Sequence, residues 1–144
     1  MARQVNGIDS SILVYALDPT TDEHVRARDS ILSTQAWAIN PTVVHESYHT
    51  LVFKRGMSPG DGRLKLRALV RDRRTAFLNL TKTISLFSLD LGHKLNLGGR
   101  DALIVGCYLR NGMETMLTHD EDLLSLQRLR FKGREMKFVD PVAT

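Results

Sequence analysis

Short apolar runs with strand-forming residues alternate with longer helical stretches along the whole chain. The runs lie at residues 5–8, 37–39, 77–80 and 115–117, with a weaker one at 136–139. The segments between them predict helices at 11–17, 22–34, 42–54, 61–73, 83–95, 101–110 and 122–128. Strands that are joined through helices pair in parallel, because parallel neighbours need a crossover connection. The pattern therefore predicts an α/β fold, a three-layer α/β/α sandwich with a mainly parallel central sheet.

The chain is expected to form one domain over residues 1–144, because it contains no internal repeat, low-complexity segment or long linker. The apolar run at 8–17 is interrupted by Asp9 and is too short to cross a membrane. No small-residue cleavage site follows it, as a signal peptide would require. The single cysteine, Cys107, excludes an intramolecular disulfide and fits a reducing compartment. We expect a cytoplasmic protein without membrane contact.

Basic residues are concentrated in two segments of this chain, whose net charge is +4. Residues 61–74 hold six basic and two acidic side chains, and a second basic cluster lies at 128–137. Arg63, Arg67 and Arg71 recur every fourth residue, so on a helix they form one stripe. Such a stripe suits a polyanion such as nucleic acid, although a solvated helix face has the same pattern.

Four acidic residues follow the predicted strands or open the helices that come after them: Asp9, Glu46, Asp101 and Asp120, here called the candidate acids. Functional groups of open parallel sheets gather beyond the carboxyl ends of the strands, where helix N-termini also point. Taken singly, three of these positions are equally explained by helix capping, with Asp101 opening a predicted buried helix.

The four carboxylates taken together suggest a metal site. Carboxylates within a few ångströms of each other repel, unless a cation neutralises them. A set of oxygen ligands favours Mg²⁺ or Mn²⁺ over zinc. Hard divalent cations activate water and stabilise negative charge on a phosphodiester during hydrolysis. An acidic cleft combined with basic patches therefore suggests a nuclease.

The motifs around the candidate acids resemble those of PIN-domain proteins, and particularly of VapC-type toxins from prokaryotic toxin–antitoxin pairs. The segments GIDSSILVYALD, NPTVVHESYHTL, GGRDALIVGCYLRNG and MLTHDEDLL resemble the four blocks of that family, in the family's order. The resemblance spans essentially the whole chain. It implies a PIN-like fold and makes Asp9, Glu46, Asp101 and Asp120 the catalytic, metal-binding acids.

The same resemblance assigns supporting residues. Thr118 corresponds to the hydroxyl beside the fourth acid, Asp122 to a more variable metal-binding acid, and Ser11 to a small polar residue near the first acid. Asp122 is also explained as a helix cap. Leu123 departs from the family's aromatic residue at this position, which concerns packing more than chemistry.

The resemblance implies Mg²⁺- or Mn²⁺-dependent endonucleolytic cleavage of RNA, in which water attacks phosphorus and leaves a 5′-phosphate and a 3′-hydroxyl. It also implies a homodimer and a cognate antitoxin protein. Two alternatives remain at this point: a stand-alone PIN nuclease of RNA processing or quality control, and a non-catalytic module that binds RNA or a protein partner.

Residues 45–49, HESYH, also match the zinc-protease pattern H-E-x-x-H. The elongated form of that signature needs glycine and histidine where this chain has Val52 and Arg55. Catalytic zinc requires three protein ligands, and no third ligand follows at a suitable spacing. We therefore interpret His45 and His49 as polar edges of a half-buried helix and Glu46 as the functional residue.

Overall fold

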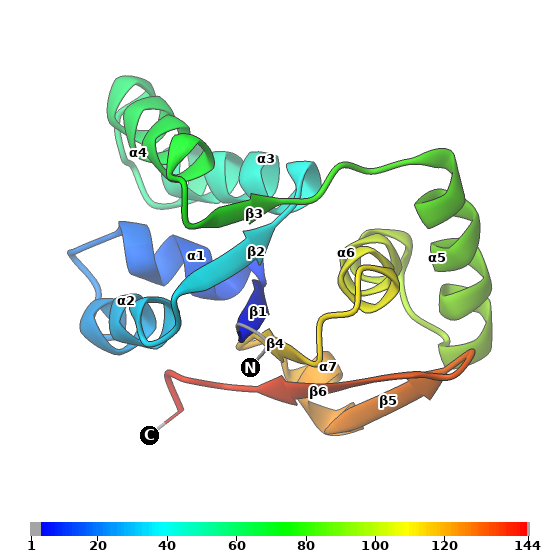
Figure 1. Ribbon diagram of the computed structural model, residues 1–144. Coiled ribbons are helices and arrows are strands. Elements are labelled where there is room, and N and C mark those ends of the chain that lie inside the picture. Colours follow the sequence, from blue (N-terminus) through cyan, green and yellow to red (C-terminus); the bar gives the residue numbers. More distant parts are fainter. Residues whose placement is uncertain (1–3, 144) are drawn as a thin grey trace.

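A six-stranded, mostly parallel sheet forms the centre of the protein (Figure 1). The computed structural model describes residues 4–143. The strand order is β3-β2-β1-β4-β6-β5, and only β5 runs antiparallel to its neighbour, β6. The strands are β1 (Val5–Ile8), β2 (Ala36–Ile39), β3 (Thr75–Phe77), β4 (Thr115–Leu117), β5 (Arg128–Phe131) and β6 (Arg134–Val139).

Helices cover the sheet on both faces, with α1 to α4 on one side and α5 and α6 on the other (Figure 1). This arrangement confirms the predicted three-layer α/β/α sandwich. The helices are α1 (Ser10–Leu17), α2 (His24–Leu32), α3 (Pro41–His49), the π-helix η1 (Thr50–Lys54), α4 (Pro59–Arg71), α5 (Lys82–Leu95), α6 (Gly99–Arg110) and α7 (Glu121–Leu126). None of the helices within residues 4–143 is both long and apolar enough to span a membrane.

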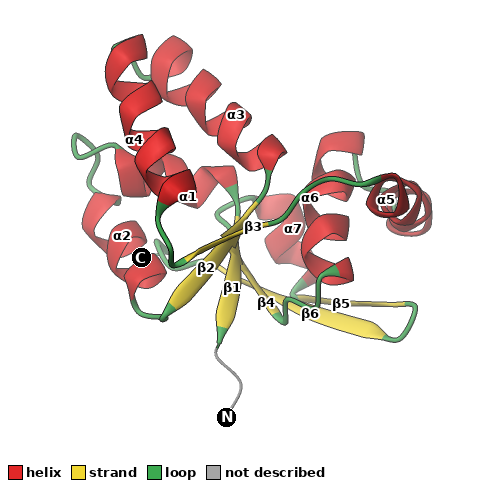
Figure 2. Cartoon of the chain, turned by 45° about the horizontal axis from the view of Figure 1, so that its top comes forward, coloured by secondary structure: helices red, strands yellow, loops and turns green. Residues whose placement is uncertain are grey.

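The chain reverses its winding direction beside β1. From β1 it proceeds through β2 to β3 on one side, and it then crosses to β4 on the other side. In Figure 2, β1 runs from the lower part of the view up toward the helices. The carboxyl ends of β1 and β4 therefore form a topological switch point, the usual position of a functional site in such sheets.

Helix α6 lies deep in the core, as its apolar sequence predicted, with Ala102 and every residue from Ile104 to Leu109 buried. Its Tyr108 hydroxyl donates to the carbonyl oxygens of Ile8 at 2.6 Å and of Ala38 at 3.2 Å. The Tyr108 ring packs on the backbone of Gly7, where a Cβ would lie 2.6 Å from a ring carbon. Tyr108 thus fixes α6 against the ends of β1 and β2.

Several predicted elements end one to three residues away from their bounds in the structure, and three of the differences have a structural explanation. The strand expected at 77–80 lies at Thr75–Phe77, because the Trp37 indole N–H donates to the Thr75 hydroxyl at 2.8 Å and sets the pairing of β3 with β2. The helix expected at 42–54 continues from α3 into the π-helix η1. The helix expected at 122–128 ends at Leu126, because the chain then enters β5, which was not predicted.

Candidate active site

Asp9 is a nearly buried carboxylate at the end of β1, where it also caps α1. Its Oδ1 accepts from the Ser10 N–H at 2.8 Å. Its Oδ2 accepts from the hydroxyls of Thr118, at 2.7 Å, and of Ser11, at 3.2 Å. Burial raises the pKa of Asp9, the three hydrogen bonds lower it and repulsion by Glu46 raises it, with the net result above the ordinary value of 3.8. This carboxylate is held by neutral donors only.

Thr118 connects the end of β1 with the start of α7. Its hydroxyl donates to Asp9 and accepts from the backbone N–H of Asp120 at 3.0 Å. Asp120 then caps α7, since its Oδ1 accepts from the N–H groups of Asp122 and Leu123 at 2.9 and 3.1 Å. The capping interpretation of Asp9 and Asp120 is therefore confirmed. It leaves Oδ2 of Asp120 without a capping role, so capping and metal binding are compatible there.

Glu46 lies in α3, which begins after the end of β2. The Ser10 hydroxyl donates a short hydrogen bond to its Oε1. Nε of Arg100 lies 2.8 Å from its Oε2, although this buried oxygen accepts no hydrogen bond, so the contact is an ion pair without a well-directed N–H. Glu46 is thus linked to α1 through Ser10 and to α6 through Arg100.

Asp101 lies in the first turn of α6, but the expectation that it caps this helix is wrong. The N-cap is Gly98, which provides no side chain, and α6 begins at Gly99. Burial and repulsion by Asp120, Glu46 and Asp122 raise the pKa of Asp101 above its ordinary value, against the opposing effect of Arg100. The carboxylate therefore lies in the negative potential of acids from two other segments, α3 and the start of α7.

The chemistry of these side chains fits a hard divalent cation. The candidate ligands are carboxylates, Glu46 offers a buried oxygen without a hydrogen bond, and the pKa values of Asp9 and Asp101 are raised by burial and by neighbouring carboxylates. Within residues 4–143, however, no three His, Cys, Asp or Glu side chains surround one point as a complete ligand set. The Arg100 guanidinium contacts Oε2 of Glu46 in this conformation, so binding of a metal ion to this oxygen requires side-chain movement.

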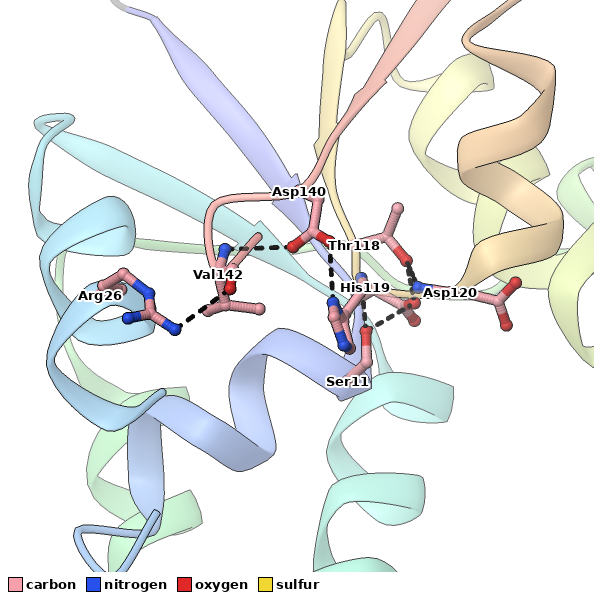
Figure 3. A network of polar contacts seen from close by, with 8 residues as sticks. Ser11, Arg26, Thr118, His119, Asp120, Asp140 and Val142 are labelled. Carbon is pink, nitrogen blue, oxygen red and sulfur yellow. Dashed lines mark hydrogen bonds and ion pairs between the residues drawn. The ribbon is translucent and has the colours of Figure 1, made fainter. Parts of the chain in front are cut away.

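A second polar network borders the site on the side of the C-terminal segment (Figure 3). The backbone N–H of His119 donates to the Ser11 hydroxyl at 3.0 Å, and the ring nitrogen Nδ1 of His119 lies 2.8 Å from Oδ2 of Asp140. Oδ1 of Asp140 accepts a hydrogen bond from the backbone N–H of Val142. The carbonyl oxygen of Val142 accepts one from the Arg26 guanidinium. This network holds the segment after β6 against α1 and α2.

The predicted arginine stripe lines a groove between α3 and α4. Arg63, Arg67 and Arg71 contribute to its wall together with His45 and Tyr48, and the groove has a volume of about 390 Å³. The structure thus brings the three arginines to one surface, which confirms the stripe but not its binding to RNA. In the same HESYH segment, His49 stacks on Phe53 with ring centroids 5.3 Å apart.

Two contacts of the candidate acids were not predicted from the sequence, those of Ser10 and Arg100. Ser10 adjoins Asp9, so the repeated serine in the segment IDSS was the available signal. Arg100 adjoins Asp101, but its contact with Glu46 depends on how α6 packs against α3. No local pattern carries that information.

With this geometry in view, comparison with known proteins identifies the family. A family model described as PIN domain matches residues 8–130. The chain therefore belongs to the PIN-domain family, and the resemblance noted in its sequence is confirmed. No match was found among the curated proteins.

Solved structures with the same fold include bacterial toxins. VapC20 of Mycobacterium tuberculosis, a toxin that cleaves the sarcin–ricin loop, has a TM-score of 0.71 at 13% identity over 85% of this chain and 95% of its own. VapBC2 of Rickettsia felis, bound to a DNA fragment from its promoter, has a TM-score of 0.67 at 15% identity, over 95% of this chain and 98% of its own. A toxin–antitoxin complex from Klebsiella pneumoniae has a TM-score of 0.65 at 19% identity, over 94% of this chain and 97% of the matched chain. At these identities the similarity establishes the fold.

Proposed function

We propose that this protein is a divalent-metal-dependent endoribonuclease and the toxin of a toxin–antitoxin pair. The observation that carries the proposal is the mutual repulsion of carboxylates from different segments near the switch point of a PIN-domain sheet: Glu46 acts on Asp9, and Asp120, Glu46 and Asp122 act on Asp101. Hydroxyl groups, and not lysines, hold the most buried of these carboxylates. Carboxylates arranged in this way repel one another, and a bound metal cation would neutralise that repulsion.

In this proposal Asp9, Glu46, Asp101 and Asp120 hold one or more Mg²⁺ or Mn²⁺ ions, and Asp122 supports them from the first turn of α7. The cation supplies positive charge that polarises the scissile phosphate and activates water for attack. Thr118 and Ser11 fix the orientation of the Asp9 carboxylate through their hydroxyl groups. No side-chain nucleophile is required.

The RNA is proposed to reach this site along basic surface. Arg63, Arg67 and Arg71 on the wall of the α3–α4 groove present guanidinium groups that suit phosphates of a single strand. In a homodimer, a second copy of this surface would extend the RNA path. An Arg67→Ala protein with intact fold should bind RNA more weakly and with a shallower salt dependence, measured by anisotropy across a salt series, and unchanged binding would remove Arg67 from the path.

The toxin role rests on the fold shared with VapC20 and with the toxin–antitoxin complexes of other bacteria. We propose that a cognate antitoxin protein binds this chain and keeps its RNA-cleaving activity in check in the cytoplasm. Expression of this chain alone should arrest growth, and co-expression with a small protein encoded just upstream of its gene, where the proposal places the antitoxin, should relieve the arrest. Persistent arrest, with both proteins present, would speak against that neighbour as antitoxin.

The decisive experiment incubates total cellular RNA with purified protein in Mg²⁺, Mn²⁺, Zn²⁺ or EDTA. Asp9→Asn and Glu46→Gln proteins serve as tests. Asp61→Asn serves as the matched control, because Asp61 is an exposed carboxylate in α4 whose side chain makes no hydrogen bond or ion pair with residues 4–143. Discrete fragments should form in Mg²⁺ or Mn²⁺ with wild-type and Asp61→Asn protein and should be absent with the two test variants.

The ends of those fragments, mapped by sequencing, would identify the RNA target. Correctly folded wild-type protein that cleaves no RNA in any of the metals would contradict the proposal. Cleavage that survives Asp9→Asn would instead indicate a contaminating nuclease or a different site.

A further inference from the structure

The side chain of Arg100 lies against one of the candidate acids. Its Nε is 2.8 Å from Oε2 of Glu46, while 68% of the Arg100 side chain remains exposed to solvent. Within residues 4–143, no other lysine or arginine forms an ion pair with any of the candidate acids. Arg100 therefore supplies the positive charge in direct contact with this otherwise anionic site.

Arg100 and a divalent cation would require the same oxygen. Oε1 of Glu46 already accepts from the Ser10 hydroxyl, so Oε2 is the oxygen available to a metal ion. Two positive charges at one carboxylate oxygen repel each other strongly. Binding of a cation to Glu46 would therefore displace the guanidinium, and its largely exposed side chain leaves it free to turn.

The displaced guanidinium stays tethered beside Asp101, at the edge of the site. It has then lost its carboxylate partner and faces a new anion, the phosphate that the cation attracts. Five N–H donors in a planar fork match phosphate oxygens, and negative charge on those oxygens grows in the transition state of hydrolysis.

We propose that Arg100 is a catalytic residue that exchanges partners: it neutralises Glu46 in the metal-free protein and binds the scissile phosphate once a divalent cation has taken Glu46. This inference rests on the proposed ribonuclease function and extends it by naming the group that contacts the phosphate. If it is correct, removal of Arg100 strengthens metal binding but weakens the binding and cleavage of RNA.

The first measurement is Mn²⁺ binding by isothermal titration calorimetry to wild-type, Arg100→Ala and Arg100→Lys protein. Arg110→Ala is the matched control, since Arg110 is exposed at the other end of α6 and forms no ion pair within residues 4–143. Arg100→Ala should bind Mn²⁺ roughly two- to fivefold more tightly, the range that corresponds to loss of an exposed ion pair. Arg110→Ala should match wild type. Unchanged or weaker binding by Arg100→Ala would overturn the competition for Glu46.

The second measurement is binding of a labelled single-stranded RNA of mixed sequence, by fluorescence anisotropy in Ca²⁺ and in EDTA. Arg100→Ala should bind the RNA more weakly than wild type in Ca²⁺ and equally in EDTA, where Arg100 remains on Glu46. An equal loss in both solutions would show general electrostatic attraction and would overturn the exchange.

The third measurement is single-turnover cleavage in saturating Mg²⁺. Arg100→Ala should cleave on the order of 100-fold more slowly, with part of the rate restored by Arg100→Lys or by added guanidinium ion. If Arg100→Ala cleaves at the wild-type rate, Arg100 does not contact the scissile phosphate. If wild type binds Mn²⁺ and RNA as described but cleaves nothing, the ribonuclease proposal and the catalytic role fail together. The exchange of partners would then stand on the two binding measurements.

Discussion

Removal of one buried hydroxyl, in Tyr108→Phe, should loosen the connection between the core and the candidate active site. The Tyr108 hydroxyl donates to Ile8, the residue before Asp9, and lies near the carbonyl of Ala38 at the end of β2. Burial raises the pKa of Tyr108 well above its ordinary value, so the hydroxyl keeps its proton and remains a donor. The substitution leaves a buried carbonyl without this donor and adds no new contact.

Loss of a donor to a buried acceptor costs about 1–2 kcal/mol of unfolding free energy. For a domain of this size that corresponds to a fall in Tm of roughly 3–8 °C. Urea denaturation followed by circular dichroism would measure the free energy, with Tyr48→Phe as control because the Tyr48 hydroxyl bonds to no group within residues 4–143. A Tyr108→Phe protein within about 0.5 kcal/mol of wild type would refute the bridging role.

Three further outcomes follow from the site. Gly7→Ala should destabilise the fold by about 1–3 kcal/mol or more, seen in urea denaturation, because the new methyl group meets the fixed Tyr108 ring at 2.6 Å. Thr118→Val should cost about 1–3 kcal/mol and slow RNA cleavage, whereas Thr118→Ser should retain both properties, since the bridging hydroxyl is kept. Asp101→Asn should raise Tm at pH 7 in EDTA. The pKa of Asp101 is raised in the folded protein, so its negative charge opposes folding at pH values above the ordinary pKa of 3.8. The increase in Tm should therefore become smaller as the pH falls toward 4. An unchanged Tm of Asp101→Asn at pH 7 would contradict this prediction.

The layers of the fold were predictable because apolar periodicity fixes buried elements. Strands β1 and β4 lie in the middle of the sheet, and their predicted bounds agree with the structure. The β5–β6 hairpin was not recognised, although Arg128–Phe131 alternates exposed arginines with buried apolar residues as a half-buried strand does, because the helix predicted at 122–128 was extended into its first residue. Its turn places Lys132 and Gly133 at positive φ, and a lysine gives little indication of that conformation.

In the candidate site, contacts within one sequence motif could be predicted, whereas contacts between helices far apart in the sequence could not. Thr118 lies two residues before Asp120 in one motif, so the resemblance of that motif to the PIN-domain family was enough to assign it. The contact between Arg100 and Glu46 joins α6 to α3 and depends on packing that no short segment encodes. The π-helix η1 is a similar case, because its hydrogen-bond pattern widens within a segment whose composition is helical throughout.

The electrostatic contrast between the site and the remaining surface supports a functional origin of the cluster. Asp72, on the surface, is hydrogen-bonded by the Arg74 guanidinium, which lowers its pKa to about 2. Asp9 and Asp101 have raised pKa values, since burial and neighbouring carboxylates oppose their charge. A chain with 20 lysines and arginines could have paired these acids as well. Hydroxyl and backbone donors orient the Asp9 carboxylate without neutralising it. In the proposed mechanism this charge is available to a divalent cation, and Arg100 is the group that the cation would displace from Glu46.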